Sequence, residues 1–167
     1  MAAAAGVAVP TVFAYFKTRS DLMHAVLGEV ARFYRTTTNR YDRPEVPAPR
    51  VILDAAIAFV SSIDSDPDYA RILLEWSASV REEMWPLFVR LQHGQLAYFA
   101  SVIARGQREG AISREIDTED TAAIIVGAWH LIAQMKFMHR PPEQVHRFLL
   151  TLLRAAIGGP AVAEALT

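Results

Sequence analysis

The chain has 167 residues, of which 52% are hydrophobic; it carries 17 basic and 18 acidic side chains and contains no cysteine. This length suits one domain with at most a small appendage, and the lack of cysteine excludes disulfide scaffolds, thiolate zinc sites and cysteine nucleophiles. The apolar content excludes intrinsic disorder and exceeds what one core needs, which suggests a subunit interface or a ligand cavity.

The near-neutral net charge averages two different parts of the chain. Residues 1–43 carry six basic and three acidic side chains, whereas residues 44–167 carry eleven and fifteen. A basic N-terminal quarter therefore precedes an acidic body. The longest apolar run, 121–135, is too short to span a membrane, and the apolar residues 2–16 lack the positive start of a signal peptide. We expect a cytoplasmic protein with no membrane partner.

Apolar residues recur at helical spacing between proline, glycine and Asp/Ser breaks, which predicts an all-α fold. The expected helices cover residues 2–5, 10–16, 20–38, 50–62, 68–79, 81–108, 117–139 and 141–157. Thr18 and Asp21 resemble a capping box, while Asp66 and Asp117 are expected N-caps of later helices. The inward face of the 20–38 helix is expected to carry Leu22, Val26, Val30 and Phe33.

The N-terminal residues have the pattern of a helix-turn-helix: a short helix, a turn at Gly6, and a second short helix. Its apolar residues would pack inward and leave Thr11, Ala14 and Tyr15 facing a DNA groove and its phosphates. An ordinary pair of helices joined by a turn accounts for the same pattern, so the residues alone leave both interpretations open.

Two blocks of sequence resemble a known family. The stretch 4–22, with Ala-Gly-Val over 5–7, Thr-Val-Phe-x-Tyr-Phe over 11–16 and Thr-Arg-x-x-Leu over 18–22, resembles the DNA-binding signature of the TetR family of bacterial transcriptional regulators. The block from Glu-Trp-Ser-Ala-Ser to Trp-Pro-Leu-Phe over 75–88 is similar to that of the vibrio quorum-sensing master regulators of the LuxR/HapR/SmcR type. The resemblance extends more weakly over residues 1–157.

The resemblance implies a TetR-like fold, with a partial helix-turn-helix and connecting helix over 1–38 and a ligand-binding and dimerisation domain over 39–160. Residues 161–167 are expected to form a frayed tail. The family's DNA-binding domain has three helices, and this chain begins within the second. We therefore expect that its start is truncated or assigned too late, and that the chain as it stands binds DNA poorly.

The resemblance also implies a double-stranded DNA operator as a partner. Val9, Pro10 and Thr11 begin the recognition helix, and Tyr15, Thr18 and Arg19 match positions that contact phosphate. Lys17 adds charge where those regulators usually carry proline. Where the quorum-sensing regulators carry a base-reading asparagine, Ala14 offers only apolar contact with a thymine methyl. Operator preference therefore does not carry over from the family.

A set of mostly aromatic and aliphatic residues in the body has two interpretations. Each residue taken alone is typical of a core position at helical spacing. As a set, the resemblance implies a mostly apolar pocket for a small-molecule effector, lined by Phe59, Leu73, Trp76, Phe88, Gln92, Leu96, Phe99 and Trp129. Gln92 would be its polar group, and Trp129, which replaces a small residue of the relatives, would partly fill the cavity.

The last two expected helices carry more apolar residues than one core requires. In the family this pair forms the two-fold, four-helix interface of a homodimer, which spaces two DNA-binding heads one DNA turn apart. The expected interface residues are Ile124, Ile125, Ala128, Leu131, Ile132, Leu149, Leu152, Leu153 and Ala156. A monomer that buries these residues more deeply is the alternative.

The sequence contains no phosphate-binding loop, nucleophile elbow, dinucleotide fingerprint or zinc-protease motif. Asp21 with His24, and Glu143 with His146, have the carboxylate-x-x-His spacing of di-iron bundles, but no inward carboxylate pair completes such a site. We expect no enzymatic activity, metal or cofactor. The sequence predicts a ligand-controlled TetR-type regulator with a quorum-sensing link. The alternatives are a dimerisation module that titrates full-length regulators and a helical-bundle metalloenzyme.

Overall fold

The computed structural model describes residues 11, 14–79 and 84–158, and this part of the chain contains helices and no strand. The all-α prediction is thereby confirmed. The expected helix over 2–5 lies outside the described residues, as do residues 10, 12 and 13 of the one over 10–16; residues 11, 14 and 15 are helical. The helices are α2 (Arg19–Asn39), α3 (Ala48–Ser65), α4 (Pro67–Ala78), α5 (Met84–Glu109), α6 (Thr118–Phe137) and α7 (Pro142–Ile157).

Short side chains determine where several helices begin. The Thr18 hydroxyl accepts a hydrogen bond from the Asp21 backbone N–H at 3.0 Å, and the Asp21 carboxylate accepts one from the Thr18 N–H at 3.0 Å, which completes the predicted capping box of α2. Asp117 caps α6 by accepting from the N–H groups of Glu119 and Asp120 at 2.9 and 2.8 Å.

Asp66 is the N-cap residue of α4, as predicted, but its side chain does not cap the helix. The Asp66 carboxylate accepts a hydrogen bond from the Ser65 hydroxyl at 2.7 Å and makes no capping bond to α4. The helix begins with Pro67, whose fixed φ suits a first helical position and which has no N–H to satisfy there.

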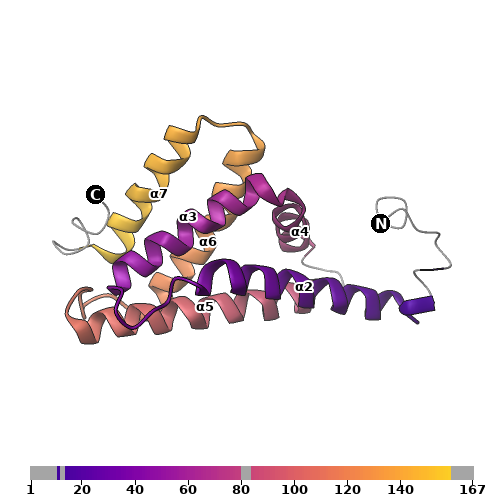
Figure 1. Ribbon diagram of the computed structural model, residues 1–167, viewed down its shortest axis with the longest axis horizontal. Coiled ribbons are helices and arrows are strands. Elements are labelled where there is room, and N and C mark those ends of the chain that lie inside the picture. The colour runs from indigo at the N-terminus through magenta and orange to yellow at the C-terminus, as the bar shows by residue number, and fades with distance from the viewer. Residues whose placement is uncertain (1–10, 12–13, 80–83, 159–167) are drawn as a thin grey trace.

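The helices form a bundle in which α2 and α5 run side by side along one edge (Figure 1). Helix α3 lies against α2 and α5, and α6 packs between α5 and α7. The first turns of α2 extend beyond the body toward the N-terminus (Figure 1). Within the described residues, no helix combines the length and apolarity that crossing a bilayer requires.

The buried face of α2 differs from the predicted one. Val30 is buried as expected, but its buried apolar neighbours are Met23, Leu27 and Tyr34. The other three predicted residues, Leu22, Val26 and Phe33, are only partly buried. The apolar stripe of α2 is wide enough for two contacts: its centre faces the core, and Leu22 and Val26 on its flank border a groove of about 470 Å³ beside α4.

Candidate functional site

A small cavity lies where α2, α4, α5 and α6 meet. Its volume is about 20 Å³, room for roughly one water-sized group. Tyr34 reaches it from α2 and Leu73 from α4. The remaining lining residues come from α5 and α6: Phe88, Leu91, Gln92, Gln95, Val126, Trp129 and His130.

The structure brings together half of the residues predicted to line a pocket. Leu73, Phe88, Gln92 and Trp129 line the cavity; the other predicted residues, which do not line it, are Phe59, Trp76, Leu96 and Phe99. Two of these pack on Trp129 instead. The Phe59 ring stacks on it with centroids 4.4 Å apart, and the Phe99 ring meets it edge-on at 5.4 Å. Aromatic packing around Trp129 thus fills most of the space in which a larger apolar pocket was expected.

Several of the residues around the cavity carry polar side chains, although the surface that faces its space is apolar. Within the described part of the chain, four buried polar atoms have no hydrogen-bond partner: Tyr34 Oη, Gln95 Oε1, Trp129 Nε1 and His130 Nε2. All four residues line this cavity. The sequence analysis missed Tyr34, Gln95 and His130. The spacing of Phe88, Leu91 and Gln95 on one face of α5 was the available signal for Gln95.

Both titratable groups of the cavity are held in their neutral forms. Burial raises the pKa of the Tyr34 hydroxyl well above its usual value of 10.0. Burial also lowers the pKa of His130 below 6.5, and this effect outweighs the opposing hydrogen bond to the backbone of Gly127. No Lys, Arg, Asp or Glu belongs to the described lining. The cavity is therefore uncharged at neutral pH.

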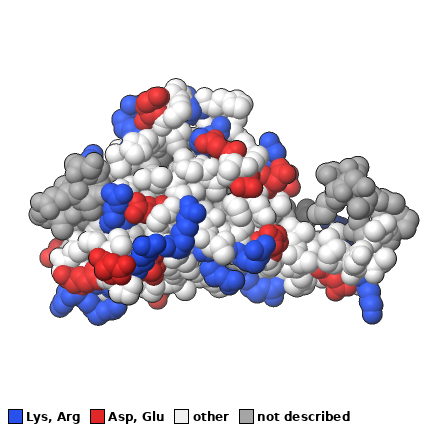
Figure 2. Space-filling model, in the orientation of Figure 1, with Lys and Arg blue, Asp and Glu red and all other residues white. Residues whose placement is uncertain are grey.

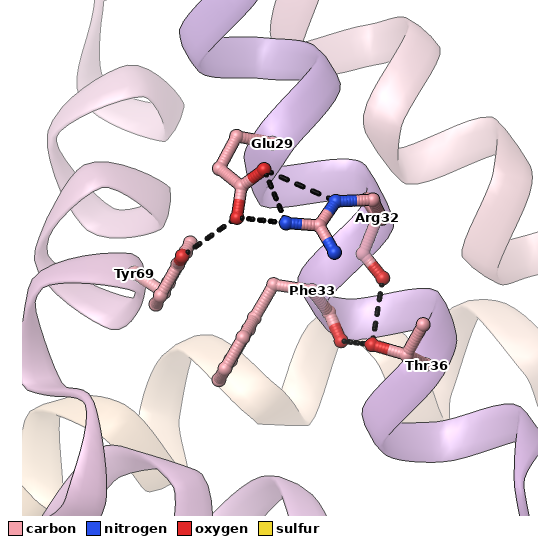
Figure 3. A network of polar contacts seen from close by, with 5 residues as sticks. All are labelled: Glu29, Arg32, Phe33, Thr36 and Tyr69. Atoms are coloured by element: carbon pink, nitrogen blue, oxygen red, sulfur yellow. Dashed lines mark hydrogen bonds and ion pairs between the residues drawn. The ribbon is translucent and has the colours of Figure 1, made fainter.

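A polar and aromatic network joins α2 to α4 at the groove that Glu29 and Tyr69 help to line (Figure 3). The Tyr69 hydroxyl donates to Glu29 Oε1 at 3.0 Å, and Arg32 Nη2 lies 2.7 Å from the same carboxylate. Phe33 and Tyr69 stack in parallel with ring centroids 3.8 Å apart. The hydrogen bonds from Arg32 and Tyr69 lower the pKa of Glu29, and the bond to Glu29 raises the pKa of Tyr69.

The predicted DNA-contacting residues stand before α2 and in its first turn. Thr11, Ala14, Lys17, Thr18 and Arg19 are exposed, and Tyr15 is the most exposed large apolar side chain described, at 81%. The Thr18 hydroxyl already caps α2. The predicted contacts Val9 and Pro10 lie outside the described residues.

The predicted dimer face divides into buried and exposed residues. Five of its members belong to the core of the single chain, because α6 and α7 pack on each other and on the body: Ile125, Ile132, Leu149, Leu153 and Ala156. Ile124 and Leu131 remain 52% and 46% exposed, with Ala128 half-buried between them on the same face of α6. Leu152 is half-buried on α7. Of the nine predicted interface residues, these four retain surface that a second copy could contact.

The described residues of the body were compared with two kinds of site: a patch of one charge sign and a metal site. On the face that Figure 2 shows, acidic and basic side chains of the described residues are interspersed rather than gathered into a patch of one sign. The described His, Asp and Glu side chains form no group of three or more that could hold a metal ion. In the first of the two carboxylate–histidine pairs, Asp21 caps α2, and His24 contacts the Ser20 carbonyl and Arg90.

Comparison with known proteins supports a regulator. No family model matches the chain. Over 128 residues it is 29% identical to the HTH-type transcriptional regulator LuxR of Vibrio harveyi, a match that covers 77% of this chain and 62% of LuxR. The chain thus matches less than two thirds of that relative's length.

A solved structure shares the fold. It is a regulatory protein of the TetR family from Rhodococcus RHA1, with a TM-score of 0.72 at 19% identity, and the superposition covers 93% of this chain and 83% of that one. Both relatives are described as regulators, which agrees with the expectation that the chain is not an enzyme. In sequence and in fold, the chain resembles the transcriptional regulators of the TetR family, LuxR among them.

Proposed function

We propose that the chain acts as a DNA-binding transcriptional regulator of the TetR type. The observation that carries the proposal is the match to the helix-turn-helix regulator LuxR, which extends over 128 residues. A link to quorum sensing rests on the resemblance of the 75–88 block. The exposure of Tyr15, Lys17 and Arg19 at the start of α2 supports phosphate contacts at this end of the molecule.

A homodimer is the second part of the proposal. Ile124, Ala128 and Leu131 form an exposed apolar stripe on α6, and Leu152 adds to it from α7. A two-fold interface uses the same patch on both subunits, and an apolar stripe of this kind can be self-complementary. Two copies would present two DNA-binding heads to one duplex.

Control by a small molecule is the third part. Leu73 lines the cavity from α4, and Tyr69, one turn earlier on α4, donates to Glu29 of α2. Tyr34 lines the cavity from α2, and its neighbour Phe33 stacks on Tyr69. A ligand that displaces Leu73 or Tyr34 would therefore disturb the contact between α4 and α2 (Figure 3). If α2 can adopt two orientations, a ligand that binds one of them more tightly would shift the population toward that orientation.

The test is binding of the chain to fluorescent duplex DNA of random sequence, measured by anisotropy between about 50 and 200 mM salt. Lys17→Ala and Arg19→Ala should each weaken binding and reduce the slope of log affinity against log salt by about one. Arg140→Ala, an exposed position beyond α6, is the matched control. Charge variants that bind duplex DNA with an unchanged slope would contradict DNA binding through this end.

A dimerisation module that titrates full-length regulators is the second candidate. The stripe on α6 favours it, because that surface does not depend on the DNA-binding head. Mixed with a full-length relative, such a module should form heterodimers that no longer bind the operator. Size-exclusion chromatography with light scattering, combined with the anisotropy measurement, separates the two candidates.

A further inference from the structure

The groove between α2 and α4 has the dimensions of a small-molecule site. Its volume of about 470 Å³ lies within the usual range for ligand pockets, about 300–1,000 Å³, whereas the cavity described above holds only about 20 Å³. Positions three or four apart adjoin on a helix, so one face of α2 supplies most of the apolar lining and α4 adds to it: Leu22, Ala25, Val26, Val30 and Ile72. The groove and the cavity share no described lining residue.

The surface that faces the groove is mainly apolar, with a smaller polar part. Among the described lining residues, the polar side chains are those of Glu29, Asp68 and Tyr69. The Glu29 and Asp68 side chains are 44% and 84% exposed, so both carboxylates remain accessible to a ligand. No Lys, Arg or His belongs to the described lining. The groove therefore combines an apolar surface with two acidic groups.

The two acidic groups border the groove from different helices. Tyr69, next to Asp68 on α4, donates a hydrogen bond to Glu29 Oε1 of α2 at 3.0 Å (Figure 3). Hydrogen bonds from Arg32 and Tyr69 lower the pKa of Glu29, so this group is ionised at neutral pH. A ligand in the groove would thus have a carboxylate on each side.

Both carboxylates have an arginine partner on their own helix, outside the described lining. Arg32 lies 2.7 Å from Glu29 Oε2, and Arg71 lies 2.7 Å from Asp68 Oδ1. The two arginine side chains are more than half exposed, and solvated ion pairs of this kind are weak. A carboxylate can accept about four hydrogen bonds and Arg71 donates one to Asp68, so Asp68 can bind a second cation.

We infer that the groove binds an amphiphilic organic cation. The apolar part of this ligand lies against the aliphatic side chains of α2 and Ile72, and its ammonium or amidinium group lies between Glu29 and Asp68. An anionic ligand would be repelled by both carboxylates, and a neutral one would gain little from them. The inference goes beyond the proposed function and does not depend on it, because none of the predicted DNA-contacting residues lines the groove.

The test compares three probes that share one apolar part: 4-phenylbutylamine, a cation at pH 7, 4-phenylbutanol, which is neutral, and 4-phenylbutyrate, an anion. Binding is followed in ¹H–¹⁵N spectra through the backbone amides of Ala25, Glu29, Asp68 and Ile72. The amine should shift these resonances saturably and bind at least about threefold more tightly than the alcohol, and the carboxylate should bind most weakly. Added salt should reduce these ratios, because the carboxylates are partly exposed. Equal affinities, shifts confined to other parts of the chain, or no binding of any probe would overturn the proposal.

A charge variant tests the role of Asp68. Asp68→Asn removes one carboxylate from the groove at nearly constant shape and should reduce the ratio of amine to alcohol affinity about twofold or more. Glu143→Gln is the matched control: like Asp68 of α4, Glu143 of α7 is exposed, follows the proline that begins its helix, and lies in the first turn. It does not line the groove, so the ratio should be unchanged. Equal effects of the two substitutions would contradict a contact with Asp68.

A second variant tests the position of the site independently of charge. Ala25 is exposed on α2, so the ring introduced by Ala25→Phe does not enter the core but occupies part of the groove. Binding of all three probes should weaken at least about tenfold, while Ala97→Phe, at an exposed position of α5 outside the groove, should leave it unchanged. Unchanged binding to Ala25→Phe would show that the probes bind elsewhere and would overturn the proposal.

Discussion

Arg90 of α5 donates a hydrogen bond to His24 of α2, with Nη2 3.2 Å from Nε2. The other ring nitrogen of His24, Nδ1, lies 2.8 Å from the Ser20 carbonyl oxygen. A carbonyl accepts only, so Nδ1 carries the proton and Nε2 is the acceptor for Arg90. The His24 imidazole therefore connects the N-terminal part of α2 to Arg90 of α5.

Arg90→Ala should loosen the N-terminal half of α2 without unfolding the protein. Both side chains are exposed, so the free energy of unfolding should fall by less than about 0.5 kcal/mol. Amide hydrogen exchange over residues 19–28 should nevertheless accelerate, because the contact between α2 and α5 near the DNA-binding end is lost. Arg147→Ala, at an exposed position on α7, is the control. Unchanged protection over 19–28 would show that the pair does not restrain α2.

Tyr69→Phe should raise the pKa of Glu29 toward its usual value of 4.5. The substitution removes one of the two hydrogen bonds that lower this pKa and keeps the aromatic stack on Phe33. A ¹³C NMR titration of the Glu29 carboxyl measures the change. Arg32→Ala should raise the same pKa further, because the Arg32 hydrogen bond has the larger effect. Identical titrations of wild type and Tyr69→Phe would contradict the bond drawn in Figure 3.

His130→Leu should change how stability depends on pH. The folded-state pKa of His130 lies below the unfolded value of 6.5, so the unfolded chain binds the proton more tightly. Stability is therefore greatest above pH 6.5 and is lost as the pH falls from 6.5 through the folded-state pKa. The leucine variant should not show this part of the loss. Urea unfolding gives the free energy of unfolding of both proteins across this pH range. If the difference between them does not change with pH, burial does not lower the pKa of His130.

The sequence predicted where the helices lie better than it predicted which of their faces are buried. Thr18 and Asp117 are local caps, so their bonds could be read from residues two or three positions away. Asp66 also occupies the predicted N-cap position, but its carboxylate bonds the adjacent Ser65 hydroxyl rather than the first turn of α4. Such competition between neighbouring polar groups depends on the detailed backbone path rather than on residue type.

The site was less predictable, because its residues meet through contacts between helices distant in sequence. Residues 122–133 of α6 are apolar except for Gly127 and His130, so their pattern could not distinguish exposed Ile124 from buried Ile125. For the same reason the sequence could not show that His130 is partly buried beside the cavity, and it was interpreted as an isolated histidine. Only the packing of α5 against α6 brings Gln95 and His130 to one cavity.

Leu131→Glu should weaken the proposed dimer while leaving the protomer folded. Leu131 is 46% exposed on α6, so a carboxylate there remains solvated in the single chain but would lie within the apolar stripe of an interface. Sedimentation velocity should show a shift toward monomer. Ser101→Glu, at an exposed position of α5, introduces the same charge away from the stripe as a control. Equal effects of both substitutions would argue against an interface on this stripe.

Gly106→Ala and Gly94→Ala should have opposite effects on stability, although both glycines lie in α5. A Cβ at Gly106 would stand 2.6 Å from Ile112 Cδ1 and 2.9 Å from Ala48 Cβ, so the start of α3 and the segment after α5 would have to move apart. We expect a loss of about 1–3 kcal/mol in the free energy of unfolding, typical of overpacking. A Cβ at Gly94 meets nothing described within 4 Å, and alanine there should stabilise the helix by about 0.5–1 kcal/mol. Urea unfolding of the two variants measures the difference; a stabilising Gly106→Ala would mean that α3 and α5 do not approach as closely as these distances require.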